Sequence, residues 1–338
     1  MMSMKMSIVI ANWNGKDLLK KCLPSVIAAA KHTKKKHEII VVDDHSIDDS
    51  VRFIKSRFPK VKVIELNENK GFIKVNNIGA KSAKGDILVF ISNDIMLKKE
   101  SLKHMLKHFK NPDTFAVAPK ILKWDKKTIQ TEFIGCKFVL GTIVQTHPGL
   151  NEIDTSKFKE PRLTFYAPGC SAMFDRKRFL KLGGFDNIYS PFYGEEPDLA
   201  YKAYRRGWVV IYEPKAVVYH KHRASVSKAF RKEALHLQEL KNRFIFTWSN
   251  FHDSRILLNH FAVLPIVFLR SAFISSYRSK RFIDIIAFFQ ALKQWKKIME
   301  KRSREKRYAK LSDKEVLSLI NSNKANELAP VSFWTFLG

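Results

Sequence analysis

Side chains able to hydrogen bond or bind metal follow three short apolar runs in the first hundred residues. They are Asn12 and Asn14 after SIVIA, Asp43 and Asp44 after EIIVV, and Asn93 and Asp94 after LVFIS. The paired aspartates could accept hydrogen bonds from a base N–H or a ribose hydroxyl, and the amides of the first run could lie near the same base. Alternatively, both aspartates only cap the loop and the next helix, with Ser46 or Asp48 as its N-cap.

Asp94 differs from the other acids because it interrupts an apolar run that predicts a buried strand. A carboxylate in that position needs a cation or hydrogen-bond donors. A divalent ion that bridges to a diphosphate would meet this need, since Mg²⁺ commonly takes one or two carboxylates together with phosphate oxygens. The other interpretation is that Asp94 caps the following helix.

The segment NKGFIKVNNIG, residues 69–79, predicts a helix that opens on a glycine. The helix N-terminus at Gly71 and the side chain of Lys70 or Lys74 could face a phosphate group. Asn76 and Asn77 fall on the second turn of this helix. The Asn-Lys-Gly pattern is also common in loops that bind nothing.

Three acids are clustered in the segment GEEPDL: Glu195, Glu196 and Asp198. Acids in the first turn of a helix ordinarily complement its dipole, and Pro197 fits the first helical position. Clustered acids also supply a candidate general base, because like charges in a cleft raise one another's pKa. His220 ends the later run VVYH, where a single histidine is either structural or, beside an acid, a metal ligand.

The elements that must position these residues are predicted by hydrophobic pattern. Short β-branched runs alternate with amphipathic ones, as in βαβ units on a parallel sheet. Strands are predicted at Ser7–Ala11, Glu38–Val42, Val61–Leu66, Ile87–Ile91 and Phe115–Ala118, and helices at Lys16–Ala30, Asp48–Arg57, Phe72–Ser82 and Lys99–Phe109. Ligands of such sheets lie beyond the carboxyl ends of the strands, where the three polar pairs fall.

The rest of the chain predicts a second half and an extension. Residues 124–163 are irregular, with a β-prone piece at Phe138–Val144, and would cover a site rather than build a core. A compact region follows at 165–222, with a helix at Pro197–Arg206. We therefore expect one α/β domain over residues 1–224, made of the halves 1–120 and 121–224, and a helical extension over 225–338.

The extension is predicted to be basic and amphipathic. Phe282–Met299 places apolar side chains at helical spacing, and nine basic residues against two acidic ones fall between Lys293 and Lys310. This suits a helix in the interface of an anionic membrane, or else a solvated charged face packed on the rest of the protein. The apolar stretch Ile256–Leu269 is expected to be too short to span a bilayer, which takes about 20 residues.

Composition narrows the possible partners. Lys and Arg number 61 against 32 Asp and Glu, a net charge of +29, which points to nucleic acid or anionic lipid headgroups. No recognisable nucleic-acid motif accompanies this charge. A dinucleotide-dependent oxidoreductase would need GxGxxG where this chain has Asn-Trp-Asn-Gly. Three widely spaced cysteines predict reduced thiols in a cytosolic protein, and the N-terminus lacks the pattern of a signal peptide.

Taken together, these segments resemble family 2 of the nucleotide-sugar glycosyltransferases, which have the GT-A fold and invert the anomeric carbon. The resemblance covers roughly residues 7–222. It rests on the order of SIVIANWNG, EIIVVDDHSIDDS, NKGFIKVNNIGAKSAKGDILVFISND, GGFDNIYSPFYGEEPDLAYKAYRRGW and EPKAVVYH. It implies a mixed α/β sheet flanked by helices, with the nucleotide sugar on the half 1–120, the acceptor on the half 121–224, and a membrane-associating helical extension after them.

The resemblance also implies a role for each candidate residue. The implied nucleotide-sugar-binding residues are Ala11 (by its backbone), Asn12, Asn14, Asp43, Asp44, Lys70, Gly71, Asn76, Asn93 and Asp94. Asp94 falls on the Asp-x-Asp region and would bind Mg²⁺ or Mn²⁺. Because Ser92 stands in place of the first acid, His220 is a second candidate metal ligand. Glu196 is the implied catalytic base, ahead of Glu195 and Asp198.

The expected reaction is transfer of a sugar from a UDP or dTDP donor to a hydroxyl of a lipid-linked or saccharide acceptor. The pattern is most similar to the branch that acts on surface polysaccharide precursors, including rhamnosyltransferases. We expect a cytoplasmic enzyme held on the inner face of the cell membrane through residues 255–310, with no nucleic-acid partner. The alternative is a basic α/β protein that binds nucleic acid or membrane without catalysis.

Overall fold

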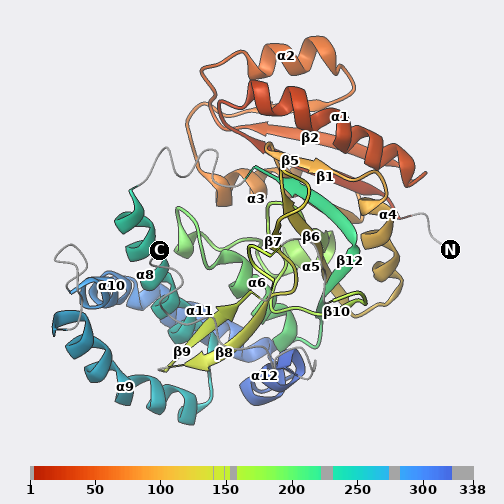
Figure 1. Cartoon of the computed structure of the whole chain (residues 1–338). Helices are drawn as coiled ribbons and strands as arrows, with labels where there is room; N and C mark the ends of the chain where they lie inside the picture. Colours follow the sequence, from red (N-terminus) through yellow and green to blue (C-terminus); the bar gives the residue numbers. More distant parts are fainter. Residues whose placement is uncertain are drawn as a thin grey trace. The chain divides into compact units, whose positions relative to one another are not determined.

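The computed structural model describes residues 4–139, 141–147, 149–152, 158–221, 231–273 and 282–321. The chain separates into two units (Figure 1). The first comprises residues 1–134, 147–185 and 208–222, and the second comprises 135–146, 186–207 and 223–338. This division differs from the expected one at residue 224, because two shorter segments that precede that point pack with the C-terminal helices.

The first unit is built on one sheet, which has ten strands in the described residues. Their order is β10-β12-β6-β11-β4-β1-β2-β3, with β5 paired to β12 and β7 to β6. The bounds are β1 Met6–Asn12, β2 His37–Asp43, β3 Lys62–Glu65, β4 Ile87–Ser92, β5 Ile95–Leu97, β6 Thr114–Lys123, β7 Ile129–Thr131, β10 Arg162–Leu163, β11 Met173–Asp175 and β12 Val209–His220. The strands from β3 to β4 are parallel and β11 is antiparallel, so the sheet is mixed, as expected.

The inner parallel strands β1, β2 and β4 are mostly apolar and buried because both of their faces are covered. Ile8 and Ile10 of β1 belong to the same core cluster as Leu19 of helix α1 (Lys16–His32). Val9 points the other way, toward helix α3 (Phe72–Ser82), where a Cβ on Gly79 would come within 2.2 Å of its side chain. Alternation along one strand thus packs a helix on each face of the sheet.

The remaining helices of the first unit are short. They are α2 (Ser50–Arg57), α4 (Ser101–Leu106) and α5 (Arg176–Lys181). The strands and helices predicted in the first 120 residues are confirmed, with bounds shifted by a few residues. The predicted helix Lys99–Phe109 is α4 followed by a 3-10 turn at Lys107–Lys110, and α2 begins two residues later than predicted.

The second unit is mainly helical. Its elements are α6 (Glu195–Arg205), α8 (Lys232–Asn250), α9 (Ser254–Phe273), α10 (Ile283–Leu292), α11 (Trp295–Tyr308), α12 (Asp313–Asn321), a 3-10 turn at Asn187–Tyr189 and the hairpin of β8 (Gly135–Val139) and β9 (Thr142–Thr146). Helix α6 is buried along most of its length. Ion pairs of 2.8 Å join Arg205 to Asp313 and Arg206 to Glu305, which ties α6 to α12 and α11.

Two predictions for the C-terminal region are wrong. The single helix Phe282–Met299 is two helices, α10 and α11, and Trp295 at the start of the second packs on Trp248 with ring centroids 5.8 Å apart. The hydrophobic periodicity of the sequence does not reveal such a tertiary contact.

The stretch at 256–269 belongs to the 20-residue helix α9, the one described helix long and apolar enough to cross a membrane. Pro265 lies inside this helix, with its ring on the exposed side.

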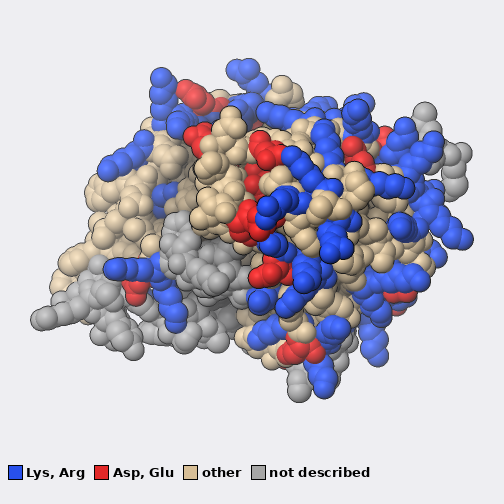
Figure 2. Space-filling view, turned by 90° about the horizontal axis from the view of Figure 1, so that it is seen from above, with Lys and Arg blue, Asp and Glu red and all other residues tan. Residues whose placement is uncertain are grey.

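The surface carries the expected excess of positive charge. Figure 2 shows Lys and Arg side chains spread over the face in view, with fewer Asp and Glu between them. The basic residues are therefore not confined to the C-terminal helices. A polyanion would meet favourable charge over a wide area of this protein.

Candidate active site

A row of three hydrogen-bonded side chains crosses the carboxyl ends of β4, β1 and β2 in the first unit. Asn93 donates its amide to Oδ1 of Asn12 over 2.8 Å, and Asn12 donates its own amide to Asp43 over 2.8 Å. The strand register makes this possible, because Asn12 lies opposite Asp43 and Ala11 opposite Ser92. The sequence prediction that these polar pairs meet at one sheet edge is confirmed.

Gly15 is needed for this row. A Cβ at that position would lie 2.1 Å from the Asn93 amide nitrogen and 2.4 Å from Oδ1 of Asn12. The backbone there is not strained, since φ is −116°. The requirement for glycine is therefore one of space, and it explains the glycine that follows Asn-Trp-Asn.

Asp43 also organises the loop after β2. Its carboxylate accepts hydrogen bonds from the Ser46 backbone N–H (2.9 Å) and the Ser46 hydroxyl (2.8 Å). Asn14, at a positive φ of 48°, accepts from the Ile47 backbone N–H over 2.8 Å. The N-cap of α2 is Asp49, so neither Ser46 nor Asp48 has the capping position predicted for it.

Asp44 fastens the loop that opens α3. Its two carboxylate oxygens accept from the backbone N–H groups of Lys70 (2.6 Å) and Gly71 (2.9 Å). Gly71 has a φ of 78°, which favours glycine. Asn76 is buried and donates to the Phe72 carbonyl one turn earlier, over 3.0 Å. This hydrogen bond stabilises the first turn of α3, and the part of Asn76 in binding the diphosphate stays a prediction.

Asp94 lies in the turn from β4 into β5 and forms a pair with His220 at the end of β12. Oδ2 of Asp94 is 3.3 Å from Nε2 of His220, and the Gln130 amide donates to Nδ1 of that ring over 2.8 Å. Helix α4 begins only at Ser101, so Asp94 does not cap it. The interpretation of Asp94 as a helix cap is therefore wrong. In the structure its carboxylate lies beside His220, the other candidate metal ligand.

The Asp94–His220 pair fits a divalent ion that takes its other ligands from a substrate. One carboxylate oxygen and one imidazole nitrogen suit Mn²⁺ and, less well, Mg²⁺. In the described residues no group of three or more His, Cys, Asp or Glu side chains is placed to hold an ion. As placed, the Gln130 amide donates to Nδ1, so Nδ1 carries no proton and the ring proton lies on Nε2, toward Asp94. Binding of an ion at Nε2 would need the Gln130 amide to turn so that its oxygen accepts from Nδ1–H, the arrangement common for metal-binding histidines.

The acidic cluster lies in the second unit, at the start of α6. Gly194 precedes it with a φ of 103°, and a Cβ there would come within 2.7 Å of the Tyr189 ring. Glu195 is buried, and burial together with the charge of Glu196 raises its pKa well above the usual value. Glu196 is partly exposed. Of the two glutamates, Glu196 is the one that solvent or an acceptor can reach.

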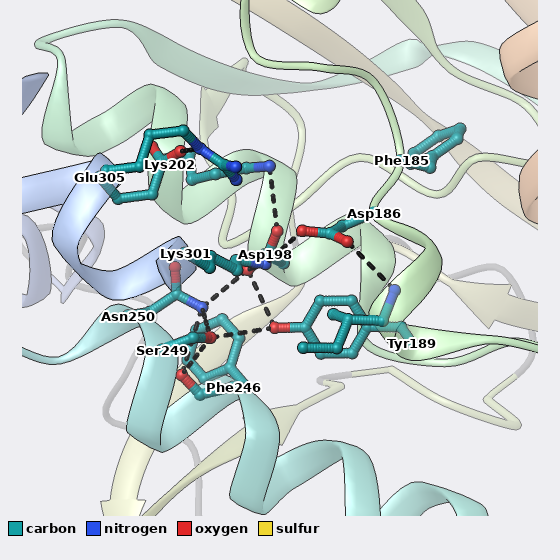
Figure 3. A network of polar contacts seen from close by, with 12 residues as sticks. Phe185, Asp186, Tyr189, Asp198, Lys202, Phe246, Ser249, Asn250, Lys301 and Glu305 are labelled. Carbon is teal, nitrogen blue, oxygen red and sulfur yellow. Dashed lines mark hydrogen bonds and ion pairs between the residues drawn. The ribbon is translucent and has the colours of Figure 1, made fainter. Parts of the chain in front are cut away.

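Asp198 is the centre of a buried polar network (Figure 3). It forms ion pairs with Lys301 (2.6 Å) and Lys202 (3.1 Å), and it accepts hydrogen bonds from Asn250 (2.7 Å) and the Tyr189 hydroxyl (2.9 Å). Burial alone would raise the pKa of Asp198, but the two lysines hold it well below its usual range. A fully buried anion with four partners is a poor proton acceptor, so Asp198 is a structural residue and not a candidate base.

Several residues of these sites were not foreseen, among them Gln130, Lys301 and Asn250. Lys301 follows Ile298 at helical spacing, and both are buried on one face of α11. A lysine on an apolar stripe is the signal that could have revealed it, because such a charge needs a buried partner. Gln130 and Asn250 carry no comparable signal, since amides are ordinary in strands and at helix ends.

Sequence comparison connects these sites to known proteins. The model of the family "Glycosyl transferase family 2" matches residues 7–182. A poly(ribitol-phosphate) beta-glucosyltransferase of Bacillus spizizenii is 37% identical over 103 residues, which are 29% of this chain and 16% of that protein. The uncharacterized glycosyltransferase YwdF of Bacillus subtilis is 29% identical over 126 residues, 37% of this chain and 45% of that protein. The chain thus spans less than half the length of either relative.

Solved structures share the fold. The crystal structure of Staphylococcus aureus TarS 1–349 in complex with UDP-GlcNAc matches with a TM-score of 0.57 at 16% identity, over 96% of this chain and 92% of that one. The crystal structure of GalNAc-T7 with UDP, GalNAc and Mn²⁺ matches with a TM-score of 0.60 at 16% identity, over 96% of this chain and 57% of that one. The expected GT-A fold is confirmed.

Replacing Glu195 by Gln should change the pH dependence of stability. A carboxyl group whose pKa is raised in the folded state holds its proton more tightly there, so stability falls as pH rises above the unfolded value of about 4.3. Glutamine carries no such proton. In urea unfolding, the free energy of unfolding of the variant relative to that of the wild type should rise from pH 5 to pH 8. The rise should be up to about 1.4 kcal/mol per pH unit. Parallel pH curves would show that Glu195 is ionised in the folded protein.

Replacing Asp198 by Asn should destabilise the protein strongly. The change removes the buried carboxylate that pairs with both Lys202 and Lys301 and leaves Lys301 with the pair to Asp186 at 2.9 Å, which typically costs about 3–5 kcal/mol. Chemical denaturation measures this loss. Glu300→Gln, on the exposed side of α11, is the matched control and should stay within about 0.5 kcal/mol of the wild type. A loss below 1 kcal/mol for Asp198→Asn would contradict the structural role.

Proposed function

Since the chain belongs to glycosyl transferase family 2, we propose that it transfers a sugar from a nucleoside-diphosphate donor to an acceptor hydroxyl with inversion. The observation that carries this proposal is the arrangement at the carboxyl end of the sheet. There Asn93, Asn12 and Asp43 form one hydrogen-bonded row, and Asp94 follows directly with His220 beside it. This is the edge at which open α/β sheets bind nucleotides.

The base and ribose of the donor are assigned to the loops that Asp43 and Asp44 organise. Each carboxylate already holds backbone N–H groups, Asp43 that of Ser46 and Asp44 those of Lys70 and Gly71. A carboxylate has about four acceptor positions, so each can take a further hydrogen bond from a base N–H or a ribose hydroxyl. UDP and dTDP are the nucleotides we propose, and the former accompanies the solved TarS and GalNAc-T7 structures.

The diphosphate is assigned to the side of Asp94 and His220. A divalent ion bound there would stabilise the negative charge that grows on the leaving diphosphate. Among the described residues, Asp94 and His220 are the two side chains placed to bind such an ion. Ion and nucleotide should therefore bind together, because each completes the environment of the other.

Glu196 is the proposed general base. The acceptor hydroxyl would give its proton to the Glu196 carboxylate while its oxygen attacks the anomeric carbon, and the bond to the diphosphate oxygen would break on the opposite side. Glu195 is unsuited because it is buried, which raises its pKa and keeps its carboxyl group away from an acceptor hydroxyl. Asp198 is unsuited because its buried carboxylate forms ion pairs with two lysines.

The acceptor is proposed to be a hydroxyl of a cell-surface polysaccharide or of its lipid-linked precursor. Support comes from the relative that glucosylates poly(ribitol-phosphate), matched over part of its length. We place the enzyme in the cytoplasm at the inner face of the membrane, where lipid-linked precursors are accessible. The charge of +29 favours attachment to anionic lipids.

The metal role of Asp94 is tested by replacing it with Asn. Mn²⁺ binding in the presence of UDP, followed by the electron paramagnetic resonance signal of free Mn²⁺, should weaken at least about tenfold, because a metal-binding carboxylate is lost. Asp125→Asn removes an exposed carboxylate that only holds its own turn, and it should leave binding unchanged. Equal Mn²⁺ affinity in the Asp94 variant and the wild type would refute the assignment.

The base is tested by Glu196→Gln against Glu195→Gln. Loss of the general base should lower the rate of transfer by about 10²–10⁴-fold while donor binding is kept. The Glu195 variant changes a buried side chain that an acceptor cannot reach, and it should retain activity. Turnover of a radiolabelled donor and calorimetric binding of UDP separate the two effects. Normal turnover by Glu196→Gln would mean that the base lies elsewhere.

A further inference from the structure

Helix α9 has its hydrophobic face on the outside. Its buried residues His260, Leu264 and Ser271 lie on one side of the helix. The opposite side exposes Leu258, Phe261, Ile266, Leu269 and Phe273, each between 47% and 77% accessible. An amphipathic helix of a water-soluble domain has the reverse pattern, with its polar side outward. The outer face of α9 is therefore apolar although it is exposed.

Helix α10 and the start of α11 continue this surface. The large exposed residues there are Phe282, Ile286, Phe289, Leu292 and Trp295. Phe268 of α9 packs against Phe288 of α10 with ring centroids 5.3 Å apart, so the two helices are neighbours. Figure 1 shows α9 and α10 on the outside of the helical unit. We call these ten exposed side chains of α9, α10 and Trp295 the apolar face.

The apolar face is bordered by basic residues. Lys293, Lys296 and Lys297 are exposed and follow its last members directly in the chain. Surface patches larger than a few hundred square ångströms that combine apolar and positive side chains mark interaction sites. A second copy of the chain has the same net charge of +29, which opposes its association with the first. An anionic bilayer attracts them and buries the apolar side chains at the same time.

The anchoring of α9 excludes a simple spanning arrangement. His260 donates from Nδ1 to the Gly141 carbonyl over 2.8 Å and accepts at Nε2 from the Trp248 indole over 2.9 Å. A bilayer around α9 on all sides would have to take in these partners and the turn of the β8–β9 hairpin. Irregular backbone exposed to lipid is too costly at that depth. The helix is held by one side and can meet lipid only with the other.

We propose that α9 and α10 lie in the plane of the membrane interface, with the apolar face in the lipid and the bordering lysines at anionic headgroups. This deepens the proposed function, because it names the surface on which the enzyme would meet a lipid-linked acceptor. It concerns binding alone, so it can be tested without donor, acceptor or turnover. Failure of vesicle binding would leave the transfer reaction untouched, and failure of transfer would leave vesicle binding untouched.

The test is co-sedimentation of the full chain with vesicles of phosphatidylcholine, with and without phosphatidylglycerol. The double variant Ile266→Glu/Leu269→Glu should reduce binding to the anionic vesicles at least about tenfold, because two charges enter the lipid-facing side. Ile47→Glu is the matched control, since Ile47 is an equally large apolar residue, 88% exposed, in the first unit. Circular dichroism checks that both variants are folded.

A second variant separates the contribution of charge. Lys293→Gln/Lys296→Gln/Lys297→Gln should weaken binding to anionic vesicles and leave the weak binding to neutral ones unchanged. Alkaline carbonate should release the wild type, as it does proteins that do not span. Three results would overturn the proposal. The first is vesicle binding that the two glutamates leave unchanged, and the second is wild-type protein that stays on the vesicles in carbonate. The third is a wild type that is dimeric and does not bind vesicles, together with a glutamate variant that is monomeric.

Discussion

The parallel pairing of β1 with β2 and with β4 is the constraint on which the donor side of the molecule depends. It brings the ends of three strands level, so that side chains far apart in the sequence form one hydrogen-bonded row. Asn12 is the middle member and both donates and accepts. The same row positions the residues next to it. Asp43 and Asp44 hold the loops on one side by hydrogen bonds, and Asp94 lies beside His220 on the other.

The helical unit depends on an interaction of a different kind, the burial of one anion among cations and amides. Asp198 unites residues from α6, α8 and α11 with the Tyr189 hydroxyl. Such a network is costly when it is incomplete, so it specifies one arrangement of these helices. It also explains why three adjacent acids have three different states. Burial raises the pKa of Glu195, two lysines lower the pKa of the enclosed Asp198, and Glu196 remains accessible.

Most of the sheet and the gathering of polar pairs at its edge could be predicted from the sequence, because strand alternation and the order of βα units determine them. The second metal ligand candidate was also predictable, through the replacement of an acid by Ser92. The break between α10 and α11 and the inclusion of 135–146 and 186–207 in the helical unit were not. They depend on tertiary contacts, such as Trp248 with Trp295 and Arg205 with Asp313, that no local pattern encodes. The positions of Gln130 and Asn250 are hidden for the same reason.

The indole-to-imidazole contact between Trp248 and His260 has a consequence for geometry. It joins α9 to α8, and α8 is joined to α6 through Asn250 and Asp198. The exposed side of α9 and the carboxylate of Glu196 are therefore held at a fixed distance from each other by buried polar contacts within one unit. A substitution that shifts α9 against α8 would change that distance, although the two residues are far apart in the sequence.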